Sequence, residues 1–210
     1  QAFLNAGIKI TLKDLRPGQE DEEGNPKCAV LQYEGGICSF VEYLNANKHA
    51  ELLHKDVVYM KAKKDDVTAE VALQYNDSFN DTIITFANNM ATIDGGTHEA
   101  GFKSGLTKVI NEYAKKCGAL KDSDKKLAGD DVREGLCAVV SVKLPDAQFE
   151  SQTKSKLGNS ELRGIVDSIV TQKLTEYFEE NPAAGKLIVE KCMAANRARE
   201  AARKARELTR

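Results

Sequence analysis

No apolar run in this 210-residue sequence approaches the ~20 residues that a membrane-spanning helix requires, so we expect a soluble chain with no membrane partner. A signal peptide is also missing, because the N-terminus Gln1–Leu4 carries no basic stretch ahead of a long apolar segment. The sequence lacks an initiator methionine as well, from which we expect a fragment of a longer protein.

Neither sign of charge dominates. The 30 basic and 32 acidic side chains leave a net charge of −2, so any binding to nucleic acid must come from local clusters of cations. Hydrophobic residues make up 41% and charged residues 30% of the chain, which excludes disorder of the whole chain. The length suits one large domain or two small ones.

Motifs for disulfides, metals and hydrolytic triads are absent. The five cysteines form no CxxC pair, and the three histidines have no HExxH spacing, so we assign no metal and no disulfide framework. Scattered reduced thiols are typical of a cytoplasmic protein. His98 has no Ser or Cys nucleophile placed near it by a motif, and it therefore does not indicate a triad.

The N-terminal part predicts a hairpin. Residues 7–15 alternate between apolar and polar, which is the pattern of a half-buried strand. Residues 17–26 form an acidic loop between two prolines, and residues 28–33 return as a second strand. The side chains expected to face inward on the first strand are Ile8, Ile10 and Leu12.

Four further strands follow. We expect strands at 57–62, 67–75 and 82–87, and the turn chemistry of Asn76–Ser78 predicts that the last two form a hairpin. The most apolar segment of the chain, 136–144, reads as a central strand.

Apolar residues three and four apart predict the helices. Thr97 suits the N-cap of a helix of about 20 residues, and Gly118 its C′ position. The predicted helices are 37–44, 97–117, a single turn at 129–135, 160–180 and one from Pro182 towards the C-terminus. Together these elements predict the α+β class, with a mixed β-sheet that carries helices on one side and a long final helix.

The final helix concentrates positive charge. Between Lys186 and Arg210 it has eight basic and three acidic residues, a local balance of +5. No aromatic residues interleave with the cations, which favours contact with a phosphate backbone without reading of bases. A solvated helical arm is the alternative. Small residues form the stripe expected to face inward: Ala194, Ala198, Ala201, Ala205 and Leu208.

Two shorter segments could also carry chemistry. Lys154 in the polar loop 148–158 is either surface charge or a mobile cation that reaches a terminal phosphate, with Gln152 as a neutral donor beside it. The glycine turn Asp94–His98 precedes a helix and could bind an anion. It has no GxxxxGK[ST] or GxGxxG pattern, however, and a tight turn into a capped helix explains it equally well.

Five segments carry a resemblance to a known family: Tyr33–Ile37, Asp94–His98, Gly129–Leu136, Gln152–Gly158 and Ala198–Glu207. Together they resemble the ATPase components of the bacterial type IIA DNA topoisomerases. The resemblance covers essentially the whole chain and is nearer to DNA gyrase B than to the topoisomerase IV equivalent. It implies that residues 1–35 are the closing strands of a GHKL (Bergerat) ATPase domain. Residues 36–210 would be a transducer domain like the second domain of ribosomal protein S5.

The resemblance also implies an activity. The parent would be an ATP-hydrolysing, DNA-supercoiling isomerase, in which this part couples ATP binding and hydrolysis to closure of a DNA clamp and strand passage. Gln152 and Lys154 match the family's QTK motif, whose lysine reaches the γ-phosphate of ATP. The groups that hold Mg²⁺ and the adenine are absent from this sequence. We therefore expect the fragment alone to bind no cofactor and to be inactive.

The implied partners are double-stranded DNA, gyrase A or its topoisomerase IV equivalent, and a second copy through the ATPase region. Arg133 receives no role. The alternative from a different class is a non-catalytic nucleic-acid-binding or assembly module, in which Lys154 is only surface charge. The residues expected to contact DNA are Arg197, Arg199, Arg203, Lys204 and Arg206.

Overall fold

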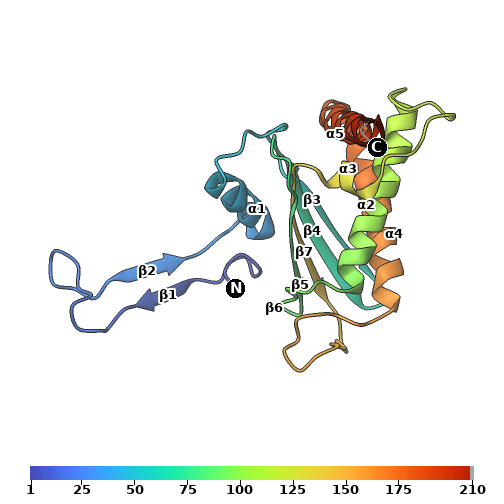
Figure 1. Ribbon diagram of the computed structural model, residues 1–210. Coiled ribbons are helices and arrows are strands. Elements are labelled where there is room, and N and C mark those ends of the chain that lie inside the picture. The colour runs from blue at the N-terminus through green and yellow to red at the C-terminus, as the bar shows by residue number, and fades with distance from the viewer. Residues whose placement is uncertain (209–210) are drawn as a thin grey trace.

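A five-stranded mixed sheet forms the centre of the molecule, as the computed structural model shows for residues 1–208 (Figure 1). Its strand order is β3-β4-β7-β5-β6. The predicted strands are confirmed to within a few residues. The strands are β3 Val58–Lys64, β4 Val67–Tyr75, β5 Thr82–Ala87, β6 Met90–Ala91 and β7 Leu136–Lys143.

The predicted hairpin between β4 and β5 is wrong. Strand β7 lies between them, antiparallel to β4 and parallel to β5. Seven of the eight residues of β7 are buried. A strand this apolar is stabilised most in the middle of the sheet, where helices cover both of its faces and other strands flank both of its edges. The segment after Tyr75 therefore crosses over an inserted strand instead of turning back along β4.

Helices cover both faces of the sheet, so the prediction of helices on one side is only partly right. Helices α2 (Thr97–Lys116) and α4 (Glu161–Glu180) lie on one face, and α1 (Gly36–Asn47) lies on the other (Figure 1). Alternate residues of β4 and β7 are buried against these opposite layers, because successive strand side chains point to opposite faces. Val71 and Val140 belong to the α2–α4 core, whereas Ala72 and Val139 pack with α1.

Two more helices complete the fold. The single turn α3 (Gly129–Arg133) packs on α5 (Pro182–Leu208), the last helix that the structure describes. All the predicted helices are present, and Gly118 follows α2 with a φ of +77°, as expected of a C′ glycine. Thr97 is not an N-cap: it is the first residue of α2, and Gly96 occupies the cap position. No helix within residues 1–208 is long and apolar enough to cross a bilayer.

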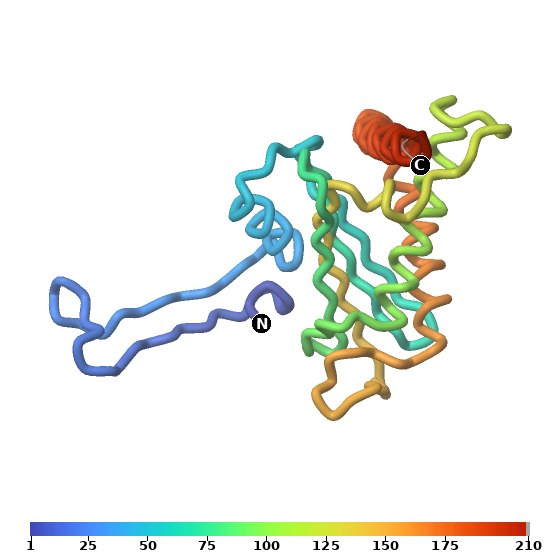
Figure 2. The backbone as a smooth tube through the Cα atoms, in the orientation of Figure 1, coloured from blue at the N-terminus to red at the C-terminus, as the bar shows by residue number. Residues whose placement is uncertain are grey.

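The N-terminal hairpin is confirmed, but its inward face is not. Strands β1 (Ile10–Lys13) and β2 (Cys28–Leu31) pair antiparallel in a sheet of their own, which runs away from the main body (Figure 2). Ile8 and Leu12 are exposed, and Leu12 keeps 56% of its surface accessible. A two-stranded sheet cannot bury a face unless something packs on it, and nothing within residues 1–208 covers these side chains.

Stacked aromatic rings hold the base of the hairpin against the body. The Phe3 ring lies 3.7 Å from that of Tyr33 and 4.6 Å from that of Phe40, measured between centroids. Phe40 belongs to α1 and also contacts Phe86 of β5. Offset stacking of this kind fixes where the hairpin leaves the sheet.

Candidate functional site

The loop 148–158 is anchored at both limbs and exposed at its tip: the amides of Glu150 and Gly158 donate across it to Lys156 (3.0 Å) and Gln148 (2.8 Å). Three backbone hydrogen bonds join its second limb to the glycine turn before α2. Ser155 accepts from the Asp94 amide (2.9 Å), the Leu157 amide donates to Gly95 (3.1 Å), and the Leu157 carbonyl accepts from Thr97 (3.1 Å). Ser155 and Leu157 are buried. The loop is therefore fixed immediately after Lys154.

Lys154 and Gln152 lie at the exposed tip of this loop. Lys154 adopts a φ of +56°, and its amide donates to the Ser151 carbonyl at 3.0 Å. Within residues 1–208 its ammonium group has no hydrogen-bond or ion-pair partner. Lys156, two residues further on, instead pairs with Glu150 at 2.9 Å. Of the two lysines, Lys154 is the one whose charge is available to a ligand.

The glycine turn Asp94–His98 supports the loop. Its Gly95 amide donates to the Thr92 carbonyl at 2.9 Å, and the Asp94 and Thr97 amides are taken up by the loop. These three amides are therefore not available to an anion, and the interpretation as a tight turn into a helix is the better one.

Behind the turn, His98 is fully buried. Its Nε2 lies 3.0 Å from the hydroxyl of Thr92, while Nδ1 has no partner within residues 1–208. Burial lowers the pKa of His98 to about 4, so the ring is neutral at physiological pH.

The predicted inner stripe of α5 is wrong. The helix buries Ile188, Val189, Cys192 and Ala195, whereas Ala194 and the later members of the alanine stripe are exposed. The described residues beyond Glu200 are all exposed, because the helix continues past the part of the body on which it packs. The alanine stripe has the three- and four-residue spacing of a packed helix face, but a different face of α5 is buried.

Arg199, predicted to contact DNA, is held by a buried carboxylate. Its Nε and Nη2 donate to the two oxygens of Asp131 at 2.7 and 2.8 Å. Asp131 is only 1% exposed and also accepts from Asn196 and from the Ala128 amide. Burial by itself would raise the pKa of Asp131, but these hydrogen bonds outweigh burial and lower it. Sequence reasoning missed this pair, because its partners are 68 residues apart.

The other predicted cations of α5 are exposed. Arg203 pairs with Glu200 at 2.9 Å and Glu207 at 2.6 Å along its own helix. Arg197 and Lys204 have no ion-pair partner within residues 1–208, and Arg206 is also exposed. Of the predicted cations, Arg197 and Lys204 are therefore well placed to meet a phosphate.

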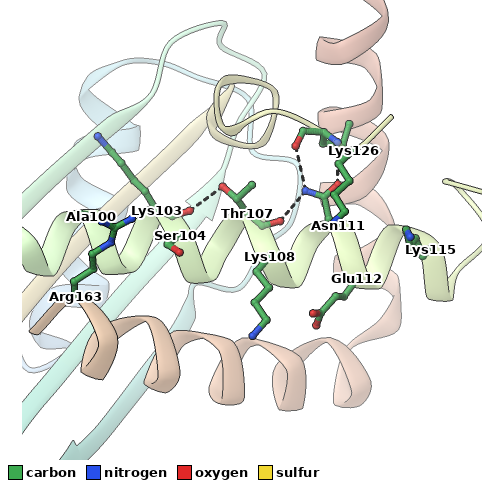
Figure 3. Close-up of a pocket in the computed structure, with 11 residues that line it drawn as sticks. Ala100, Lys103, Ser104, Thr107, Lys108, Asn111, Glu112, Lys115, Lys126 and Arg163 are labelled. Carbon is green, nitrogen blue, oxygen red and sulfur yellow. Dashed lines mark hydrogen bonds between the residues drawn. The ribbon is translucent and has the colours of Figure 1, made fainter. Parts of the chain in front are cut away.

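A second basic surface, which sequence reasoning did not find, lines a groove of about 570 Å³ along α2. Figure 3 shows its side chains, which come from α2, from α4 and from the segment before α3. Lys108, Lys126 and Arg163 have no ion-pair partner within residues 1–208, whereas Lys103 pairs with Glu99. A charge count along a single helix cannot detect this cluster, because packing of different elements assembles it.

Arg133, which had no predicted role, joins its own helix α3 to the loop before β5. It donates to Asp81 at 3.2 Å and to Asp130 at 2.5 Å. Within residues 1–208, no group of three or more His, Cys, Asp or Glu side chains is placed to hold a metal ion.

Comparison with known proteins identifies the family. The family model for DNA gyrase B matches residues 36–208. The chain belongs to the DNA gyrase B family. Among its relatives, the DNA gyrase B protein of Clostridium acetobutylicum is 57% identical over 210 residues. That of Enterococcus faecalis is 51% identical over 209 residues. Each match covers 100% of this chain but 31% of the relative, so the chain spans about a third of the length of these gyrase B proteins.

Solved structures agree with the gyrase B assignment. The 43K ATPase domain of Thermus thermophilus gyrase B, solved with an aminocoumarin, superimposes with a TM-score of 0.83 at 40% identity. The match covers 99% of this chain and 53% of that one. The topoisomerase IV ATP-binding domain of Francisella tularensis gives a TM-score of 0.72 at 23% identity over 94% of this chain and 50% of that one, which shows a shared fold.

Proposed function

We propose that residues 36–210 form the transducer domain of a DNA gyrase B protein, with the S5-like fold, and that residues 1–35 close its GHKL ATPase domain. The N-terminal hairpin supports this division. Its apolar side chains Leu12 and Leu15 are exposed, and they need another body to cover them. The central sheet and its two helical layers form the core of residues 36–208, to which Leu4 of the N-terminal segment also contributes.

Lys154 is the residue through which this domain contacts ATP, with Gln152 beside it. The observation that carries this proposal is an ammonium group without a partner within residues 1–208, at the tip of a loop fixed immediately behind it. A compact cation of this kind interacts most strongly with the most highly charged oxygens of a nucleotide, those of the terminal phosphate. The remaining ATP and Mg²⁺ contacts would come from residues outside this chain.

Such a contact makes the position of the domain depend on the nucleotide. The loop gains an ionic partner when the terminal phosphate is present and loses it after hydrolysis, so the two states favour different placements of the transducer. Because the second limb of the loop is bonded to the turn before α2, the sheet and its helices would follow as one body. This is how ATP turnover would drive closure of a DNA clamp and strand passage.

Replacing Lys154 by alanine in the full-length protein should lower ATP turnover about 100-fold, since it removes a charge placed on the reacting phosphate. Steady-state ATPase assays with gyrase A and DNA present would measure this. Lys156→Ala is the matched control: it removes a lysine that already pairs with Glu150, and turnover should stay within roughly twofold. Turnover in Lys154→Ala equal to wild type would refute the phosphate contact.

We also propose that the basic end of α5 faces double-stranded DNA, within an assembly of two copies of the full-length protein and gyrase A. Arg197, Lys204 and Arg206 would contact phosphates, while Arg199 and Arg203 contribute to the local field from their ion pairs. Exposed cations without base-reading groups suit a duplex of any sequence. The groove along α2 adds Lys108, Lys126 and Arg163, which have no ion-pair partner within residues 1–208.

Changing Arg197 and Lys204 together to glutamine should weaken duplex binding more at low salt than at high salt. Removing one cation from a phosphate reduces the slope of log K against log salt by about 0.9, so the double change should reduce it by about 2. Fluorescence anisotropy with a labelled duplex over a salt series gives the slope. Arg203→Gln, whose charge is already paired along the helix, is the matched control. An unchanged slope in the double variant would remove α5 from the DNA-facing surface.

A nucleic-acid-binding module without an ATP contact is the second candidate, favoured by the cationic groove and α5, which lie outside the loop. The two tests separate the candidates. Normal turnover in Lys154→Ala together with a reduced salt slope in the α5 variant would favour the module.

A further inference from the structure

We propose that the turn before α2 is the seat that sets the position of Lys154, with Gly96 as the point of contact and His98 as an internal brace. The loop seat comprises residues 94–98. This inference rests on the proposed contact between Lys154 and ATP, and it gives the seat a positioning role in that contact. Neither Gly96 nor His98 would touch the nucleotide.

The seat acts directly behind the lysine. Ser155 and Leu157 are buried, whereas residues 151–154 are exposed, so the boundary between the fixed and the free part of the loop falls at Lys154. The three hydrogen bonds to the seat all lie on the fixed side of this boundary. A displacement of the seat would therefore be passed on to the backbone of Lys154, which is bonded directly to Ser155.

Gly96 determines how closely the loop can approach. A β-carbon at this position would lie 2.4 Å from the Leu157 carbonyl oxygen and 2.7 Å from the Leu157 nitrogen. Both are backbone atoms, which cannot rotate away as the end of a side chain can. The φ of Gly96 is also +144°, a conformation that other residues rarely adopt. Any side chain here would push the loop off its seat.

His98 ties the seat to the central sheet. Its Nε2 lies 3.0 Å from the Thr92 hydroxyl, which lies 2.6 Å from the hydroxyl of Thr85 on β5. The Thr92 amide donates to the Thr85 carbonyl at 2.9 Å, so the link includes the backbone. All three side chains are buried. Nδ1 of His98 has no partner within residues 1–208, and a buried polar atom of this kind costs stability, a cost that functional positions tolerate.

Hydrogen bonds therefore link β5 through Thr92 to His98. The neighbouring residues Gly96 and Thr97 contact Leu157, which lies three residues after Lys154. If these contacts position Lys154, disturbing them should slow the hydrolysis of ATP, in which the terminal phosphate reacts. The affinity for ADP, which lacks that phosphate, should not change.

Gly96→Ala in the full-length protein tests this. Misplacing a reacting group by about 1 Å can cost up to 100-fold in rate, so we expect ATP turnover to fall about 10- to 100-fold. The affinity for ADP should stay unchanged, which general damage to the ATPase region would not allow. The double variant Gly96→Ala/Lys154→Ala should turn over no more slowly than Lys154→Ala alone, because Gly96 acts through that lysine.

Gly164→Ala is the matched control, since no atom lies within 4 Å of the added β-carbon in α4. It should leave turnover unchanged. If Gly96→Ala does not fold, Thr92→Val takes its place, because it removes the hydroxyl link to His98 at nearly constant volume. Its turnover is then compared, alone and combined with Lys154→Ala, in the same way. Wild-type turnover in the seat variant that folds, or a further loss in the double variant, would overturn the inference. Wild-type turnover in Lys154→Ala would instead overturn the proposed function.

Discussion

Arg199→Ala should lower the free energy of unfolding by about 3 kcal/mol, although the residue lies on an exposed stretch of helix. The Arg199 side chain is 43% exposed, but the side chain of Asp131, whose charge it neutralises, is 1% exposed. Removing Arg199 leaves Asp131 with hydrogen bonds from Asn196 and Ala128 only. A buried charge without its counterion is the costly outcome, and urea unfolding followed by circular dichroism would measure it.

A double-mutant cycle separates the pair from general damage to α5. Asp131→Asn keeps the volume and removes the charge, so the loss from Arg199→Ala should be much smaller on that background. Arg203→Ala, which removes a cation from Glu200 and Glu207, neither of which is buried, should change stability little. Equal losses from Arg199→Ala with and without the Asp131 carboxylate would show that the ion pair is not responsible.

Acid should destabilise the protein through His98. The pKa of His98 is about 4 in the folded chain, against about 6.5 for an unperturbed histidine, so the unfolded chain binds the proton more tightly. The stability from the neutral ring is complete above pH 6.5 and is lost as the pH falls towards 4. The loss should be about 2 kcal/mol between pH 7 and 5 and about 3 kcal/mol by pH 4.

The pH dependence of unfolding in His98→Gln isolates this contribution from that of other groups. The variant should start less stable at pH 7 and then lose about 3 kcal/mol less than wild type by pH 4. His49→Gln, at an exposed position, controls for the removal of a histidine. Parallel curves for wild type and His98→Gln would contradict the assignment of a neutral buried ring.

Local sequence predicted most elements of this fold but not how the strands pair. The period of apolar residues located α2, α4 and β7, because burial of one face leaves its repeat in the sequence. The same signal could not place β7 between β4 and β5. Strand pairing depends on which strand buries the most apolar surface in the middle of the sheet, and that is not a local property. The hairpin of β1 and β2 shows the opposite error, because alternation predicted an inward face where nothing packs.

Only part of the candidate site could be predicted, because some of its contacts join residues far apart in the sequence. The resemblance pointed to Lys154, and the structure keeps its charge available, while the seat at Gly96 depends on a contact with residue 157 that no local pattern reveals. On α5, counting charges treated Arg197 and Arg199 alike. One has no ion-pair partner within residues 1–208 and the other holds Asp131.

The sequence by itself determined which segments are helices and strands, that the last helix is rich in cations, and which loop carries Gln152 and Lys154. These properties depend on neighbours within one or two turns of the chain, and the order of the residues records them directly. Only the tertiary structure decided which face of a helix is covered, which cation is neutralised and which glycine supports the loop. Each of those outcomes depends on groups about 60 residues apart, whose proximity is created by burial of the common core.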